Sequence, residues 1–323
     1  MSKRKLLPAA LLFLGTVIVA LSACNKDNIT LNNGTNEYTL NYLFGSLKST
    51  PQTFTVTAGT NQRIEGAKGT LLTFHPQSFR DANGNTISSG TVNIELIETY
   101  KPGTMIANRV TTSTASNRQQ TSGGSVHIKA TMNGQEVFAN NYSIGFKQSG
   151  PSENPMALFR GYAVTDSSAS DIKWADDTTG TVDRTTKVDS SESFYYLFDS
   201  CTSFNWINCD YFYSAPAPKT DITVVMPDSS YNATNTQVFV VFPAINSVTT
   251  MYAYDAATHS IKFGYSNYYL PVGSQVHIIV IGAKNNNYFT VLQQNVTVTN
   301  NMTISLTPVA QPLSYIQSLL SSL

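Results

Sequence analysis

Hydrophobic and polar residues alternate along most of this chain with a period of two, which is the pattern of β-strands that bury one face. In residues 90–98, for example, Val92, Ile94 and Leu96 share one side of the strand and more polar residues occupy the other. Short runs rich in Val, Ile, Tyr and Phe, bounded by turn residues, repeat the signal elsewhere. We predict strands at residues 38–44, 54–57, 70–74, 90–98, 125–131, 135–138, 194–198, 222–225, 237–242, 276–281, 288–292, 295–298 and 302–306, and around Trp206.

Turn residues separate these strands. Asn133 and Gly134 stand between two alternating runs and predict a tight hairpin. Residues 81–85 place Asp and Asn at alternate positions, as in the first half of a calcium loop. Thr86 stands where such a loop needs Gly, and Val92 stands where it needs a bidentate Glu. We therefore interpret residues 81–85 as a plain turn.

The composition changes at residues 149–192, which are rich in Ser, Thr, Asp and Pro. We interpret this stretch as a boundary segment with one or two strands, because Phe159 and Trp174 would be costly to leave in water. A fully solvated linker is the alternative. The chain is thus predicted to be all-β, with two β-sandwich-like domains at residues 38–148 and 193–323.

The C-terminal residues switch to a helical period. Pro312 stands at a position where a helix can begin. The apolar residues that follow it recur on one helical face, namely Leu313, Ile316, Leu319, Leu320 and Leu323. We expect a short helix that packs on the second sandwich. A membrane-binding helix is less favoured, because the polar face lacks basic residues.

The first residues resemble an export signal. Three basic residues, at positions 3–5, precede an apolar run at residues 6–21 that is too short for a comfortable membrane span of about 20 residues. The sequence Leu-Ser-Ala before Cys24 resembles a bacterial lipobox, which implies cleavage before Cys24 and lipidation of its sulfur and amine. Two or more acyl chains hold a protein stably at a membrane. An ordinary secretory signal with a chance cysteine is the alternative.

We therefore assign residues 1–23 to a lipoprotein signal peptide. Residues 24–37 are rich in Asn, Thr and Gly and are predicted to form a flexible tether. Asn25, Lys26 and Asp27 resemble the surface-export tag of lipoproteins from the Bacteroidota. The expected location is the outer membrane, with a lipid anchor as the contact to the bilayer, and the tag favours the side that is exposed on the cell surface.

The charge balance excludes one class of partner. The full chain has 20 basic and 20 acidic residues, and removal of residues 1–23 takes away three basic residues and no acidic one. The remaining net charge of −3 and the absence of a basic cluster argue against nucleic-acid binding. Cys201 and Cys209 remain after lipidation. In the oxidising cell envelope they form either a disulfide or a pair of buried thiols, and the sequence leaves both open.

Three segments resemble uncharacterised cell-envelope lipoproteins of the Bacteroidota: residues 81–105, residues 122–134 and the run Asn-Trp-Ile-Asn-Cys-Asp-Tyr-Phe at 205–212. The first segment is also similar, more distantly, to the β-domains of ankyrins and netrin receptors, which are binding modules. The resemblance implies a β-fold and an envelope location, and it brings no catalytic residues.

The sequence contains few signs of catalytic chemistry. None of the four histidines has the spacing of a helical zinc pair, and no phosphate-binding or dinucleotide-binding glycine motif is present, so no cofactor or metal is predicted. Glu95 and Glu98 lie three residues apart on one strand and hence on opposite faces, so they do not form a pair. We expect Glu98 to be buried with a partner or to cap a strand end.

Two sets of residues are candidates for a functional site. Tyr265, Tyr268, Tyr269 and Trp174 are candidates for a ligand surface that stacks on a glycan. Asp176, Asp177 and Asp183 lie near Trp174 and suggest either a calcium site, a two-carboxylate hydrolase site or merely a solvated loop.

The favoured hypothesis is a non-enzymatic binding, adhesive or structural module with an envelope protein or glycan partner. The alternative is an envelope glycan or peptide hydrolase that uses the acidic residues near Trp174. A pocket with two carboxyl groups within about 10 Å would favour the hydrolase.

Overall fold

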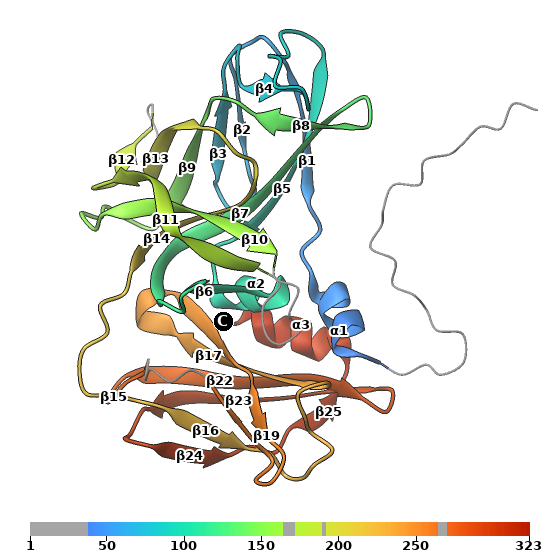
Figure 1. The fold of residues 1–323 in the computed structure, drawn as a ribbon, viewed down its shortest axis with the longest axis vertical. Helices are drawn as coiled ribbons and strands as arrows, with labels where there is room; N and C mark the ends of the chain where they lie inside the picture. Colours follow the sequence, from blue (N-terminus) through green and yellow to red (C-terminus); the bar gives the residue numbers. More distant parts are fainter. Residues whose placement is uncertain (1–37, 164–171, 189–191, 264–269) are drawn as a thin grey trace, which may run out of the picture. The chain divides into compact units, whose positions relative to one another are not determined.

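Strands dominate the structure, so the protein is all-β, as the alternating pattern predicts (Figure 1). The computed structural model describes residues 38–163, 172–188, 192–263 and 270–323. Residues Glu37–Leu323 form one compact unit. Among the described residues, no helix has the length and apolar character needed to span a bilayer.

Two sheets form the first sandwich. Sheet A is antiparallel except for the parallel pair of its last two strands, and it runs in the order β1 (Gln52–Thr57), β5 (Thr91–Thr99), β7 (Gln120–Met132), β14 (Asn205–Phe212), β10 (Met156–Ala163), β11 (Ile172–Val182) and β6 (Val110–Thr114). β8 (Gln135–Ala139) pairs with β7 and with β4 (Phe79–Arg80). Sheet B runs in the order β12 (Thr186–Lys187), β13 (Phe194–Cys201), β9 (Tyr142–Gln148), β3 (Leu71–Phe74) and β2 (Gln62–Glu65).

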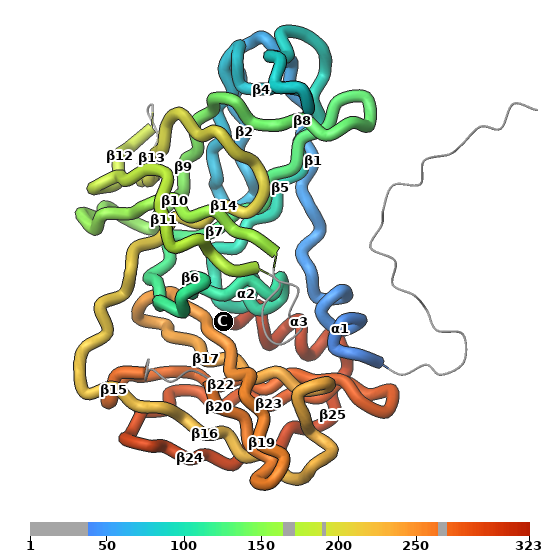
Figure 2. Tube along the Cα trace, in the orientation of Figure 1, coloured from blue at the N-terminus to red at the C-terminus, as the bar shows by residue number. Residues whose placement is uncertain are grey.

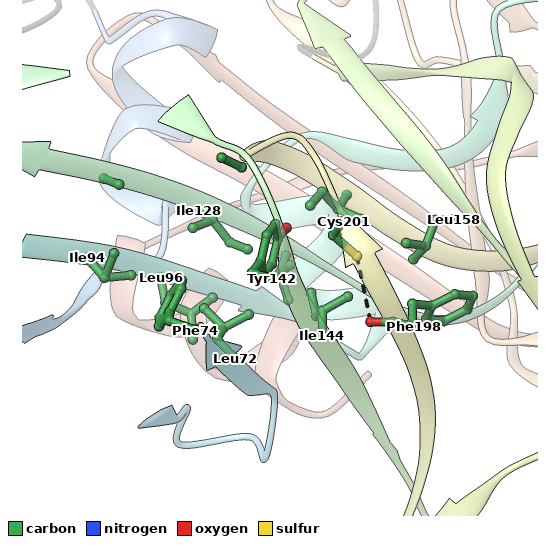
Figure 3. Close-up of a cluster of buried hydrophobic side chains, with 14 of the residues drawn as sticks. Leu72, Phe74, Ile94, Leu96, Ile128, Tyr142, Ile144, Leu158, Phe198 and Cys201 are labelled. Carbon is green, nitrogen blue, oxygen red and sulfur yellow. Dashed lines mark hydrogen bonds between the residues drawn. The ribbon is translucent and has the colours of Figure 1, made fainter. Parts of the chain in front are cut away.

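The facing sides of sheets A and B enclose one apolar core. Ile94 and Ile128 from sheet A meet Phe74, Tyr142 and Ile144 from sheet B (Figure 3). These side chains lie at alternate positions of their strands, which is why the period of two was visible in the sequence. The hairpin between β7 and β8 is confirmed, with positive φ values of 51° at Asn133 and 78° at Gly134.

The second sandwich also has two sheets. Sheet C runs in the order β18 (Ser247–Met251), β17 (Thr236–Phe242), β22 (Gln275–Lys284), β23 (Asn287–Thr297) and β25 (Val309–Gln311). Sheet D runs in the order β19 (Ala253–Asp255), β20 (Ser260–Lys262), β16 (Ile222–Val225) and β24 (Met302–Ser305). A small separate ladder pairs β15 (Lys219–Thr220) with β21 (Leu270–Pro271), and η1 (Pro243–Ile245) is a single 3₁₀ turn.

Three helices cover the other face of sheet C: α1 (Leu40–Leu47), α2 (Pro102–Ala107) and α3 (Leu313–Ser321) (Figure 1). β17 is therefore buried on both faces, with Val238 and Val240 toward sheet D and Phe239 and Val241 toward the helices. This double burial explains the unbroken apolar run of β17. The C-terminal helix is confirmed, and Ile316 lies at the centre of its buried face.

One strand prediction is wrong. Residues 40–47 form helix α1, in which Leu43, Phe44 and Leu47 are buried at helical spacing. The Thr39 side chain caps the helix and accepts a hydrogen bond from the Tyr42 backbone N–H at 3.2 Å. The same apolar residues fit both periods over this short length, and packing against sheet C decides for the helix.

The predicted boundary between the domains also needs correction. Residues 149–192 contribute β10, β11 and β12 to sheets A and B, so this stretch does hold strands but does not end the first sandwich. β13 and β14, which we placed in the second sandwich, pair with β9 and β7 of the first. The polar composition of β11 reflects an exposed edge strand rather than a linker. The strands of the second sandwich begin only after β14, although α1 and α2 from earlier in the chain already cover its sheet C.

Candidate functional site

A groove of about 280 Å³ opens between the two sheets of the first sandwich, at β11 and β13. It is lined by residues 179–182 of β11, by residues 197–203 of β13 and the loop that follows, and by Leu158, Arg160 and Ile207. The side chains of consecutive residues point to alternate sides of a strand. A groove that several consecutive residues line therefore runs along the backbone of the strand. We refer to this surface as the strand groove.

The groove exists because two strands lose their neighbours at this side of the sandwich. β11 pairs with β6 only at Ile172 and Trp174, and β13 pairs with β12 only at Phe194 and Tyr195. Beyond those residues, neither strand has a ladder partner on that side among the described residues. β11 and β13 approach one another there (Figure 2). Two sheet edges thus border the groove with unpaired backbone groups.

The groove combines an apolar floor with a polar rim. Leu158, Phe198 and Ile207 belong to the core between the sheets and form the floor. The rim carries Thr and Ser side chains and two charged groups, Arg160 and Asp199. The mixture is typical of a binding surface, although the volume lies just under the range of about 300–1,000 Å³ found for small-molecule pockets.

The two charged groups of the rim differ in whether they form an ion pair. The Arg160 guanidinium lies 3.7 Å from the carboxylate of Asp177, with both side chains largely exposed. Asp199 is exposed and makes no hydrogen bond or ion pair with any described residue. Asp199 therefore brings one carboxylate to the groove, and Arg63 and Asp199 both line an adjoining hollow.

Cys201 lies at the floor of the groove and is only 8% exposed. Its Sγ donates to the carbonyl oxygen of Phe198 at 3.7 Å (Figure 3). Burial, together with the nearby charge of Asp199, raises the pKa of the Cys201 thiol to about 12. The protonated thiol is a poor nucleophile at neutral pH.

The disulfide that the sequence left open is not formed. Cys201 and Cys209 are both buried free thiols. β13 belongs to sheet B and β14 to sheet A, so the connection between the two strands crosses the sandwich and is not a hairpin. Burial raises the pKa of Cys209 well above its ordinary value.

Trp174 is not a ligand surface. Its side chain is fully buried and packs with Val110, Phe159 and Ile172 on the side of sheet A that faces away from sheet B. The indole Nε1 donates to the carbonyl oxygen of Thr111 at 2.6 Å. Tyr265, Tyr268 and Tyr269 lie outside the described residues, as does Cys24.

The acidic residues near Trp174 do not converge. Asp176 accepts a hydrogen bond from the Ser116 backbone N–H at 3.2 Å, and the Ser116 hydroxyl donates to it as well. Partial burial acts to raise the pKa of Asp176, but these hydrogen bonds outweigh it and lower the pKa. Asp177 faces Arg160, and Asp183 is exposed. Among the residues that the structure describes, no three His, Cys, Asp or Glu side chains are placed to hold a metal ion.

Two predictions about polar residues are confirmed. Asp81 Oδ1 accepts hydrogen bonds from the backbone N–H groups of Asn83 and Asn85 at 2.8 and 2.9 Å, so residues 81–85 form a self-contained turn. Glu98 is buried and accepts from the backbone N–H groups of Lys68 and Thr70 at 2.8 and 2.9 Å. Its role is to fix the loop before β3.

A buried polar cluster on β14 and β7 was not predicted from the sequence. Asp210 is fully buried, and its carboxylate accepts from the Asn208 side chain. Atoms of Asp210, Asn208 and Gln120 in this cluster have no hydrogen-bond partner in the structure. Asn246 of the second sandwich donates to the neighbouring Ser122 carbonyl oxygen at 3.0 Å. Polar residues at alternate positions of a strand were the available signal, but that pattern ordinarily indicates a solvated face.

No protein-family model matches the chain, and a search of the curated proteins finds no match. The function must therefore be argued from the chain itself.

Proposed function

We propose that this protein is a lipid-anchored, non-enzymatic binding module of the bacterial cell envelope, and that the strand groove holds its partner. The carrying observation is the groove itself, an apolar floor bordered by two unpaired strand edges and one unpaired carboxylate. Such a surface offers backbone hydrogen bonds, apolar contact and one charge. Those are the elements of recognition rather than of bond cleavage.

The chemistry of the groove supports binding over hydrolysis. A two-carboxylate glycosidase needs two carboxyl groups about 5–10 Å apart, whereas Asp199 supplies the one carboxyl group among the lining residues. Asp176 is held by Ser116 and Asp177 faces Arg160, so neither offers a free base. The Cys201 thiol stays protonated at neutral pH. Among the described residues that line the groove or lie near Trp174, these groups do not form the carboxylate pair that the hydrolase alternative needs.

The location rests on the sequence. The basic start, the apolar run and the Leu-Ser-Ala-Cys24 motif support export and lipidation, and the outer membrane is the proposed site. The predicted tether at residues 24–37 would allow the folded part of the chain to reach a partner in the envelope.

The anchor is tested by Cys24→Ser. We expect this variant to leave the membrane fraction or to accumulate uncleaved, and intact membrane retention with normal cleavage would contradict the anchor.

The binding role is tested by cross-linked capture from native membranes with three proteins: the wild type, Gly180→Leu and Gly150→Leu. Gly180 lines the groove, and a Cβ there would lie 3.9 Å from the Phe198 ring, an ordinary contact, so we expect a leucine at this position to occupy part of the groove. A Cβ at Gly150 meets nothing within 4 Å, so Gly150→Leu is the matched control. We expect one envelope partner to be lost with Gly180→Leu alone. Equal capture by all three proteins would remove the groove from the proposal.

A further inference from the structure

The edge of β11 beside the strand groove is open over most of its length. β11 runs from Ile172 to Val182 and pairs with β10 along one side. On the other side, β6 pairs only as far as Trp174, and the chain then leaves the sheet at Ala115, whose N–H donates to the Trp174 carbonyl oxygen at 2.8 Å. Among the residues that the structure describes, no strand pairs with this edge at residues 175–182, which lie in line with β6.

An open edge of this length is unusual in a stable protein, because unpaired N–H and C=O groups invite pairing with other chains. Native edges are commonly blunted by charges and bulges. β11 carries Asp176 and Asp177 and has two register shifts against β10, one near Gly180 and one at residues 175–177. These features disfavour pairing with a neutral or acidic strand. A strand with basic residues would instead be attracted to the Asp176 carboxylate, whereas Asp177 already faces Arg160.

Two charged side chains line the groove itself, and only one of them forms an ion pair with another described residue. Asp199 is unpaired, whereas the nearby cation, Arg160, faces Asp177. The apolar floor at Leu158, Phe198 and Ile207 accepts side chains that point between the sheets. The surface therefore fits an extended ligand with apolar residues on one face and basic residues on the other.

We propose that the partner is an extended basic peptide segment that adds to sheet A as a strand along residues 175–182 of β11, with apolar side chains in the strand groove and a Lys or Arg beside Asp199. This inference rests on the proposed function and names the class of ligand. Backbone hydrogen bonds supply affinity in such strand addition, and pockets for alternate side chains supply specificity.

The direct test is fluorescence anisotropy with labelled, acetylated octapeptides that alternate valine with lysine. Two matched peptides serve as comparisons: one with glutamate in place of lysine, and one with lysine kept but alternate backbone amides methylated. We expect the lysine peptide to bind, the glutamate peptide to bind at least tenfold more weakly, and the methylated peptide to lose binding, because strand addition needs the N–H groups. Binding should weaken as salt increases.

Protein variants locate the site. Asp199→Asn should weaken the lysine peptide about fivefold, the upper range for an exposed ion pair, and Asp183→Asn should leave it unchanged because Asp183 does not line the groove. Gly180→Leu should abolish binding and Gly150→Leu should not. Circular dichroism checks that each variant is folded.

Each outcome bears on a different claim. Equal binding of the lysine and glutamate peptides overturns the basic ligand, and undiminished binding of the methylated peptide overturns strand addition. If no peptide binds while Gly180→Leu still loses its envelope partner, the peptide class is wrong and the proposed function stands. If peptides bind but native capture does not depend on the groove, the site is a strand-pairing edge without the proposed role.

Discussion

Replacement of Asp210 by Asn changes one buried carboxyl group to a neutral amide of nearly the same shape. Asp210 is fully buried on β14, where its carboxylate accepts from Asn208 and its Oδ1 atom has no hydrogen-bond partner in the structure. Burial raises the pKa of Asp210 to about 8, against hydrogen bonds from Ser122, Asn208 and Gly123 that act to lower it. The folded protein therefore holds a proton there at neutral pH.

The size and direction of the effect follow from linkage. In the unfolded chain the pKa of Asp210 returns to near 3.8. Between pH 4 and pH 8 the folded state keeps a proton that the unfolded state releases, so the free energy of unfolding falls as pH rises through that window. Each pH unit contributes about 1.4 kcal/mol. From pH 5 to pH 8 the loss is on the order of 4 kcal/mol, and it levels off above pH 8.

The assay is urea unfolding at pH 5 and pH 9 of three proteins: the wild type, Asp210→Asn and Asp183→Asn. Asp183 is exposed and serves as the control for removal of one negative charge. We expect the stability of Asp210→Asn relative to the wild type to rise by on the order of 4 kcal/mol between the two pH values. Asp183→Asn should keep the pH dependence of the wild type. The reasoning fails if Asp210→Asn and the wild type show the same pH dependence.

Other substitutions test the packing. In Gly103→Ala the new methyl group would overlap a backbone carbonyl oxygen of α3, so we expect the free energy of unfolding in urea to fall by about 3 kcal/mol. Gly150→Ala is the control and should leave the free energy of unfolding nearly unchanged. Glu98→Ala removes the acceptor of three hydrogen bonds and should destabilise by about 3 kcal/mol, with faster hydrogen exchange in the loop before β3; unchanged exchange would argue against that role. Trp174→Phe removes the indole hydrogen bond and should lower the free energy of unfolding by about 1–2 kcal/mol, which a lower thermal midpoint would show. Partner capture should be unchanged.

The sequence by itself determined those elements whose signal is local. The period of two in β5 and the Asn133-Gly134 turn require only neighbouring residues, and both are present in the structure. The helical spacing of Ile316 and Leu320 likewise predicted α3. The residues that face the core recur at the period of the strand or helix itself. This pattern can be recognised without knowing which element packs against that face.

Only the tertiary structure decided which elements meet. Residues 40–47 fit two periods, and the face of sheet C selected the helix. β13 and β14 belong to the first sandwich, where they pair with β9 and β7. These partners lie far away in sequence, so local sequence did not reveal the pairing. The strand groove exists where β6 and β12 stop short, and Asp210 is buried because the second sandwich covers the neighbouring face of sheet A. Pairing and burial of this kind depend on contacts between distant segments, and no window of local sequence contains them.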